Sequence, residues 1–286
     1  MTITTQFLTA LDRFTTSQKR QVSSIFQGEQ SSETVGEGLI FSDYRRYTPG
    51  DEPRLIDWKL YARTEELYIK QFEEERNLTV HVLVDASGSM DFGDEDTNKF
   101  EYAAKLGLGF AYLTASEHND FRFTVFDDTP ERLDSGRSNR GEILGLIDRC
   151  NAIDPAGGAN FADVLTEYAG TIDSRSLLLI VSDFLEDVSA IRTGVESLVD
   201  NQLILAHVLA PEERDLPADG DTVFRDLETD RTERTYFGRR LAESYRDRLL
   251  DHVDSIEELA DELRIRHEAI DTGAPFFESF ADVWIE

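Results

Sequence analysis

Cysteine is almost absent from this chain. Cys150 is the only cysteine among 286 residues, which excludes a disulfide framework and a zinc site built on cysteines. No apolar run approaches the ~18 residues needed to cross a membrane, and residues 1–30 lack the apolar stretch of a signal peptide. We therefore expect a cytoplasmic protein without a membrane span, in which Cys150 is a buried, inert thiol.

Basic residues are scarce as well. Lysine and arginine together number 29 against 58 aspartates and glutamates, which gives a formal net charge of −29. The acids are spread along the whole chain, as on a surface adapted to high salt, where cations screen the self-repulsion. The alternative is an ordinary acidic cytosolic protein. In either case nucleic-acid binding is disfavoured, because phosphate contacts require a basic face.

The hydrophobic pattern divides the chain into three regions. Residues 1–35 have apolar side chains at helical spacing and then a polar loop, residues 36–76 are a loop-rich segment of arginines and aromatics, and residues 77–286 form the main domain. In this domain strands alternate with helices, and a hairpin over 221–238 precedes a long helix. Strands are predicted at 78–84, 120–126, 176–181, 202–209 and 265–270, and helices at 100–115, 141–151, 161–169, 188–199 and 239–264. This alternation predicts an α/β fold, with a mainly parallel central sheet and helices on both faces.

Two of the predicted strands end in side chains that carry oxygen. One buried strand leads directly into Asp85, Ser87 and Ser89, and a second buried strand leads into Asp183. Open α/β sheets bind their ligands at the carboxyl ends of their strands. If the two strands are neighbours, Asp85 and Asp183 meet at one edge of the sheet, where two like charges favour a bound cation or a shared proton.

Carboxylates and hydroxyls are hard oxygen donors, which suit Mg²⁺ or Mn²⁺ and not zinc. The loop 155–160 precedes a helix and is a candidate to complete the site. Its glycines permit close backbone approach, and Asn160 offers either an amide oxygen to the metal or a cap to the helix. The alternative is a site without metal, in which Ser87 and Ser89 only cap the helix that follows and satisfy Asp85.

Residues 36–76 contain the most basic stretch of this acidic chain. Arginine and aromatic side chains anchor protein interfaces, so this stretch is a candidate contact surface. The candidate contacts are Arg45, Arg46, Arg54, Trp58 and Arg63. The alternative is structural: the arginines pair with nearby acids and fix the segment to the sheet.

The Asp-x-Ser-x-Ser sequence at 85–89, together with Asp183, resembles the metal-ion-dependent adhesion site of von Willebrand factor A domains. The stretch from Gly38 to Met90, and above all Tyr44 to Arg63, is more specifically similar to an uncharacterised bacterial and archaeal family of such domains. Genes of that family commonly lie beside those of MoxR-type AAA+ ATPases. The resemblance covers roughly residues 33–275 and implies a Rossmann-like von Willebrand A domain.

The resemblance also implies that Asp85, Ser87, Ser89 and Asp183 hold the metal. One position departs from the family pattern. Where the family has Gly-Gly-Thr-Asp, this chain has Ala159 in place of the threonine ligand. Because Mg²⁺ prefers near-octahedral oxygen coordination, we expect a lower affinity, with water or Asn160 in the missing position.

These observations favour a protein-binding module that is not an enzyme, in which Mg²⁺ or Mn²⁺ accepts an acidic group of a partner. The resemblance implies an adaptor or co-chaperone of a MoxR-type AAA+ ATPase and its client protein, and the acid surplus implies a haloarchaeal source. Two alternatives stay open. One is a metal-free scaffold that uses residues 44–63, and the other is a metal-dependent phosphoester hydrolase, for which no general base is visible.

Overall fold

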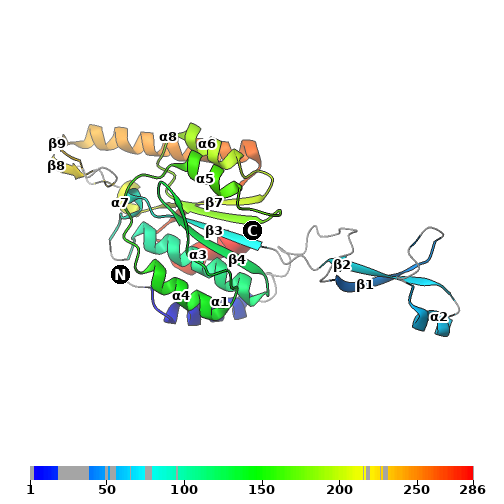
Figure 1. Cartoon of the computed structure of the whole chain (residues 1–286). Coiled ribbons are helices and arrows are strands. Elements are labelled where there is room, and N and C mark those ends of the chain that lie inside the picture. Colours follow the sequence, from blue (N-terminus) through cyan, green and yellow to red (C-terminus); the bar gives the residue numbers. More distant parts are fainter. Residues whose placement is uncertain are drawn as a thin grey trace. The chain divides into compact units, whose positions relative to one another are not determined.

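The computed structural model of the chain describes residues 3–18, 39–48, 51, 56–64, 66–74, 79–94, 96–214, 216, 220–225, 227 and 231–285. The chain divides into two compact units (Figure 1). The larger unit consists of Met1–Val22 and Leu78–Glu286, and the smaller one of Ser23–Asn77. Among the described helices, none combines the length and the apolar character that crossing a membrane requires.

A six-stranded sheet forms the centre of the larger unit, in the order β10-β7-β6-β3-β4-β5. All neighbouring strands are parallel except β5, which runs antiparallel to β4. The central strands β3 and β6 are buried along nearly their whole length, which explains why their sequences are continuous apolar runs. The strands are β3 (Thr79–Asp85), β4 (Asp120–Phe126), β5 (Pro130–Arg132), β6 (Leu177–Ser182), β7 (Gln202–Leu209) and β10 (Arg266–Asp271).

Helices cover both faces of this sheet (Figure 1). One face carries α3 (Lys99–Ser116) and α4 (Arg140–Cys150), and the other carries α5 (Phe161–Ala169), α6 (Val188–Glu196) and α8 (Arg239–Leu263). Helix α3 lies close against the sheet because Gly107 has no side chain: a Cβ there would be only 2.7 Å from Cγ1 of Val82. The prediction of an α/β fold with a mainly parallel sheet is confirmed.

The first and last described helices pack together beside α3. Helix α1 (Gln6–Gln18) contacts α9 (Phe276–Ile285) through aromatic rings, with ring centroids 5.4 Å apart both for Phe7 with Phe276 and for Phe14 with Phe280. The helical pattern predicted within residues 1–35 is confirmed for α1, and residues 19–35 lie outside the described part of the chain. Helix α9 was not predicted.

The smaller unit contains a two-stranded antiparallel sheet of β1 (Leu39–Arg46) and β2 (Tyr68–Glu74), with α2 (Trp58–Thr64) between them in sequence. Strand β2 lies where residues 66–72 (ELYIKQF) alternate between polar and apolar, a pattern typical of a half-buried strand. The interpretation of this region as loop-rich was wrong for β1. Its mixture of aromatic, basic and acidic residues has no clear period, and a two-stranded ribbon does not need the alternation that a half-buried sheet requires.

A hairpin and a long helix lie between β7 and β10 in the larger unit. Strands β8 (Gly220–Arg225) and β9 (Thr232–Phe237) pair antiparallel, as the sequence predicted over 221–238, and α8 follows directly. Between β7 and this hairpin lies a four-residue helix, α7 (Pro211–Arg214), which was not predicted. Helix α7 contributes one residue to the site described next.

Candidate functional site

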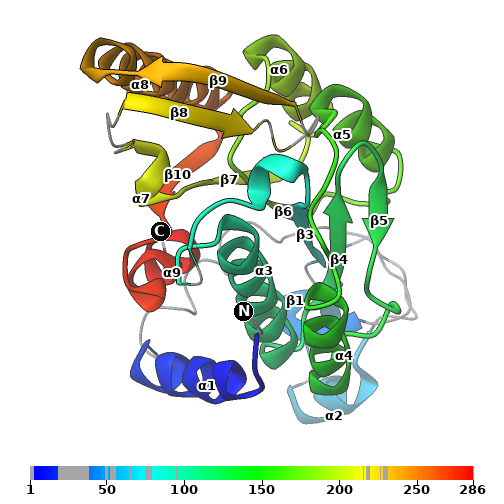
Figure 2. The same cartoon turned by 90° about the vertical axis from the view of Figure 1, so that its left-hand side faces the viewer.

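The ends of β3 and β6 lie side by side at the carboxyl edge of the sheet. The two strands pair in parallel with Val84 opposite Val181, which fulfils the condition that the sequence had left open. A side-chain hydrogen bond joins the two strand ends directly, because Ser182 Oγ donates to Asp85 Oδ2 at 2.5 Å. Figure 2 shows this edge, with the single-turn helix η3 (Gly88–Met90) in cyan beyond β3.

Asp85 is fully buried, and both of its oxygens accept a hydrogen bond. The Ser87 backbone N–H donates to Asp85 Oδ1 at 2.8 Å, while Ser182 holds Oδ2. Burial, and then the charge of Asp183, raise the pKa of Asp85 to about 7. The carboxyl group is therefore close to the midpoint of its titration at neutral pH, and a cation placed beside it would favour the ionised form.

The two serine hydroxyls face each other in front of this carboxyl group. Ser87 Oγ and Ser89 Oγ are 3.1 Å apart, and the Ser87 side chain makes no capping hydrogen bond to η3. Neighbouring ligands around an octahedral Mg²⁺ are about 3 Å apart, since each lies about 2.0–2.1 Å from the ion. The serine pair therefore fits such an ion. In the described part of the chain no three His, Cys, Asp or Glu side chains form a metal cluster, so hydroxyls would have to contribute ligands.

The loop 155–160 lies against the turn that carries the serines. Gly88 N–H donates to the carbonyl of Gly157 at 2.8 Å, and Gly157 has a φ of +76°, which favours glycine. Asn160 serves as the N-cap of α5: its Oδ1 accepts a hydrogen bond from the Asp163 N–H at 3.3 Å. The sequence predicted that the amide oxygen of Asn160 is either a metal ligand or a helix cap, and in the structure it caps α5. Ala159 contributes no side-chain oxygen.

Lys99 also reaches this edge, from the first turn of α3. Its ammonium group is fully buried and pairs with Asp183 Oδ2 at 2.6 Å and with Glu213 Oε1, from α7, at 2.5 Å. Burial lowers the pKa of Lys99, but the charges of Asp183 and Glu213 outweigh it and raise that pKa above its ordinary value. Sequence reasoning missed this residue. A signal was available, because a positive charge in the first turn of a helix opposes the helix dipole and needs a partner.

The buried groups at the edge do not balance in charge. Asp85, Asp183 and Glu213 supply three carboxylates against the single ammonium of Lys99, which leaves two negative charges when all are ionised. His207 on β7 does not compensate them, since burial lowers its pKa to about 3 and keeps it neutral. Unbalanced buried charge is costly, so the cluster favours the uptake of a proton or of a cation.

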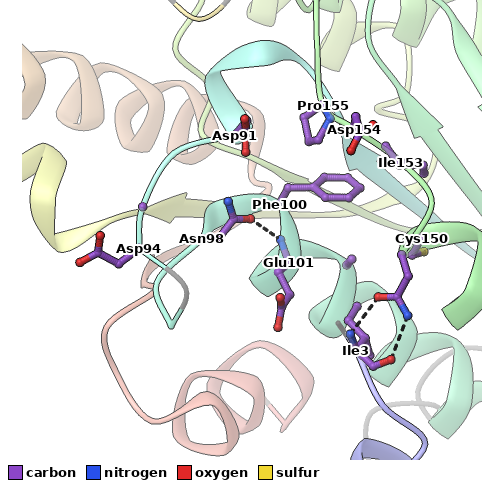
Figure 3. Close-up of a pocket in the computed structure, with 13 residues that line it drawn as sticks. Ile3, Asp91, Asp94, Asn98, Phe100, Glu101, Cys150, Ile153, Asp154 and Pro155 are labelled. Carbon is purple, nitrogen blue, oxygen red and sulfur yellow. Dashed lines mark hydrogen bonds between the residues drawn. The ribbon is translucent and has the colours of Figure 1, made fainter. Parts of the chain in front are cut away.

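A hollow of about 340 Å³ opens beside the serine turn (Figure 3). Asp91 and Asp94, which follow η3, and Asp154, which precedes the loop 155–160, line it together with the ring of Phe100. The aspartates at the hollow add further negative charge next to the edge site. An acidic partner would therefore be repelled here unless a cation lies between.

The arginines predicted as partner contacts are mostly paired within the smaller unit. Arg45 pairs with Asp51 at 2.9 Å and Arg46 with Glu66 at 2.8 Å, which is the pairing with nearby acids that the structural alternative expected; both acids belong to the smaller unit itself. The hydrogen bond from Arg45 is the main reason why the pKa of Asp51 lies well below its usual range. Arg54 lies outside the described residues.

One aromatic residue of this segment is strongly exposed. The Trp58 side chain is 61% exposed and lies edge-on to Tyr61, with ring centroids 6.2 Å apart. Asp57 precedes α2 and caps its first turn, since its carboxylate accepts hydrogen bonds from the backbone N–H groups of Lys59 and Leu60. Arg63 is exposed in the last turn of the helix. The structure therefore leaves Trp58 and Arg63 as surface candidates.

Comparisons with known proteins find one family of unknown function and several uncharacterised relatives. The family described as "Protein of unknown function DUF58" matches residues 43–253. Uncharacterized proteins of Mycobacterium tuberculosis and Mycobacterium bovis are 26% identical over 223 residues, which cover 74% of this chain and 68% of each relative.

Solved structures resemble the chain more distantly. An aerotolerance-related membrane protein from Bacteroides fragilis aligns with a TM-score of 0.46 and 15% identity, over 72% of this chain and 96% of its own. The conserved hypothetical protein BatB from Bacteroides thetaiotaomicron aligns with a TM-score of 0.45 and 14% identity, over 72% and 98% respectively.

Proposed function

The chain belongs to the DUF58 family of proteins of unknown function, and we propose that it is a protein-binding module whose sheet edge holds a divalent cation. Through that cation the module binds an acidic group of a partner. One observation carries the proposal: Asp85, Ser87, Ser89 and Asp183 gather at the ends of two neighbouring strands, in a cluster that has two unbalanced negative charges when all its groups are ionised.

The residues have separate tasks in this proposal. Ser87 and Ser89 hold Mg²⁺ or Mn²⁺ through their hydroxyls, and Asp85 and Asp183 lie behind them as counter-charges. Ser182 fixes Asp85 and Lys99 fixes Asp183, so neither carboxylate has to reorient when the ion binds. The bound ion supplies an open coordination position for an oxygen ligand. A carboxylate is the natural ligand there, because the ion offsets the repulsion expected from a chain of net charge −29.

We propose binding and not hydrolysis. Asp85 is the carboxyl group at the edge whose pKa lies near neutrality, and a general base would need to reach the substrate's proton. Asp85 is fully buried, and each of its oxygens already accepts a hydrogen bond. It is therefore poorly placed for proton transfer to or from a substrate.

The segment Tyr44–Arg63 resembles the uncharacterised family of von Willebrand A-like domains named above, and this resemblance supports two finer proposals. The first is that the α/β unit is a von Willebrand A-like domain, and the second is that the partner is a MoxR-type AAA+ ATPase or its client. A metal-free scaffold is the competing function, and the 61% exposure of Trp58 favours it. Partner binding that survives EDTA and is lost in Trp58→Ala would support the scaffold instead.

Calorimetric titration with MgCl₂ tests the cation site. At about pH 8, where Asp85 is ionised, the EDTA-treated full chain should bind one Mg²⁺ ion. Ser89→Ala removes one hydroxyl ligand and should weaken binding at least about tenfold, or roughly 1.4 kcal/mol. A matched control is Ser255→Ala, since Ser255 is half-buried on α8, far along the sequence from the serine turn, and its hydroxyl donates to the carbonyl of Asp251.

The control should bind Mg²⁺ as the unmodified chain does. The absence of binding heat in the unmodified chain would reject the cation site. Equal affinities for the unmodified chain and Ser89→Ala would reject the serine hydroxyls as ligands.

A further inference from the structure

Arginines gather at a second surface of the larger unit, where β9 joins α8. Residues 231–248 contain six arginines and three acidic residues, in a chain that has twice as many acidic as basic residues overall. The field of surface charges extends about 10 Å at moderate salt. By sequence, residues 231–248 are therefore more basic than the chain as a whole, although Asp221 of the paired strand β8 lies opposite Tyr236.

The first two residues of α8 present this charge to solvent. Arg239 and Arg240 are both exposed, and no carboxylate of the described chain forms an ion pair with either. Arg234 differs, because its guanidinium is paired with Asp221 across the hairpin. Two adjacent guanidinium groups are thus available to an external carboxylate, which they can bind through paired hydrogen bonds.

An aromatic ring lies beside these arginines. Tyr236 is 74% exposed, yet one side of its ring lies against backbone: a Cβ added to Gly238 would be 2.8 Å from Tyr236 Cε1. Gly220, on the paired strand, approaches the other edge of the ring, with 3.8 Å between its virtual Cβ and Tyr236 Cε2. An exposed tyrosine ring offers a large apolar face together with a hydroxyl group, and such side chains are typical anchors of protein interfaces.

The ring and the arginines border an open hollow of about 510 Å³. Its lining consists of Tyr236, Gly238, Arg239, Arg240, Leu241 and Ser244. Leu241 is 38% exposed and adds an aliphatic surface to the aromatic one. The hollow therefore combines positive charge with apolar area.

This surface lies at the same end of the unit as the sheet edge. Figure 2 shows β8, β9 and α8 on the side that also presents η3. A hydrogen bond of 3.1 Å from Arg246 Nε to the carbonyl of Arg214 ties α8 to α7, the helix that supplies Glu213 to the buried cluster. One partner protein can therefore contact both places, although the surface needs no cation at the edge.

We propose that Tyr236, Arg239, Arg240 and Leu241 form a docking surface for an acidic peptide segment of a partner protein. Carboxylates of the segment pair with Arg239 and Arg240, and an adjacent apolar side chain packs on Tyr236 and Leu241. A nucleic acid fits less well, because its continuous phosphate charge would extend over a surface of net charge −29.

A displayed library of random peptides of about twelve residues tests this surface on the full chain in EDTA. Selection should enrich sequences in which Glu or Asp flank an aromatic or aliphatic residue. By fluorescence polarisation, the best enriched peptide should bind the unmodified chain at least about tenfold more tightly than Arg239→Glu/Arg240→Glu. A charge-matched control is Arg137→Glu/Arg175→Glu, since both arginines are exposed elsewhere on the unit. This control and Ser89→Ala should bind the peptide as the unmodified chain does.

Four outcomes would overturn the proposal. They are enrichment of no peptide, enrichment without an acidic bias, equal binding to Arg239→Glu/Arg240→Glu, and tighter binding of a twelve-nucleotide single strand than of the peptide. Because the assay contains EDTA and includes Ser89→Ala, its result does not depend on the cation site. A failure of one proposal is thereby distinguished from a failure of the other.

Discussion

Replacing Lys99 with methionine should lower the free energy of unfolding by about 3–5 kcal/mol, the usual cost of leaving a buried charge without its partner. Lys99 is fully buried, and its ammonium group is the cation that pairs with both Asp183 and Glu213. Methionine fills a similar volume, so the loss reflects the stranded carboxylates more than a cavity. Urea denaturation at about pH 8 measures the change.

Two further variants make this result specific. Lys105→Met removes a lysine from the same helix, but Lys105 is partly exposed and pairs with Glu101 one turn away, so the loss should stay below about 1 kcal/mol. Adding Glu213→Gln to Lys99→Met should recover part of the stability, because one stranded carboxylate becomes neutral. If Lys99→Met cost no more than Lys105→Met, the ion pairs would not have the strength that their burial implies.

Asp85 should make the chain lose stability as the pH rises from about 4 to about 7 in EDTA. Its pKa is about 7 in the folded chain against 3.8 ordinarily, so in this interval the folded state holds a proton that the unfolded state has released. The stabilisation that Asp85 contributes is complete below pH 3.8, the ordinary pKa, and is lost as the pH rises through about 7, the pKa in the folded chain. At about 1.4 kcal/mol for each pH unit, the loss approaches 4 kcal/mol.

Other groups titrate in the same interval, so the measurement must be a difference. Burial also raises the pKa of Glu117 to about 7, whereas burial lowers the pKa of His81 to about 4 and that of His207 to about 3, and these histidines act in the opposite direction. Asp85→Asn leaves all three unchanged. The stability of the unmodified chain minus that of Asp85→Asn should therefore fall between pH 4.5 and 7.5, and a flat difference would contradict the buried, charge-coupled position of Asp85.

The sequence predicted the centre of the fold well, because the patterns that specify its strands and helices lie within single short segments. Strands such as 120–126 and 202–209, and the helix at 161–169, coincide with β4, β7 and α5. Buried parallel strands need continuous apolar runs, and the helices that cover them need a period of 3.6 residues. Both signals are contained within one segment of the chain.

The site was predicted only in part, because its remaining members depend on tertiary structure. Asp85 and Asp183 could be named from the strand ends, but their proximity required the strand order. Lys99 and Glu213 are 114 residues apart, and Glu213 lies on a four-residue helix that has no periodic signal. Asn160 was ambiguous for another reason: one amide oxygen suits a cap as well as a metal, and its capping bond becomes visible only with the backbone of α5.

The most direct test of the cation site is anomalous diffraction from crystals of the full chain grown with MnCl₂ at about pH 8. If the edge binds a divalent cation, a single strong peak should lie at the sheet edge, within about 2–2.3 Å of both Ser87 Oγ and Ser89 Oγ. Lys99 should still be paired with Asp183 in that structure. A well-resolved map without a manganese peak between the two serines would contradict the proposed cation site.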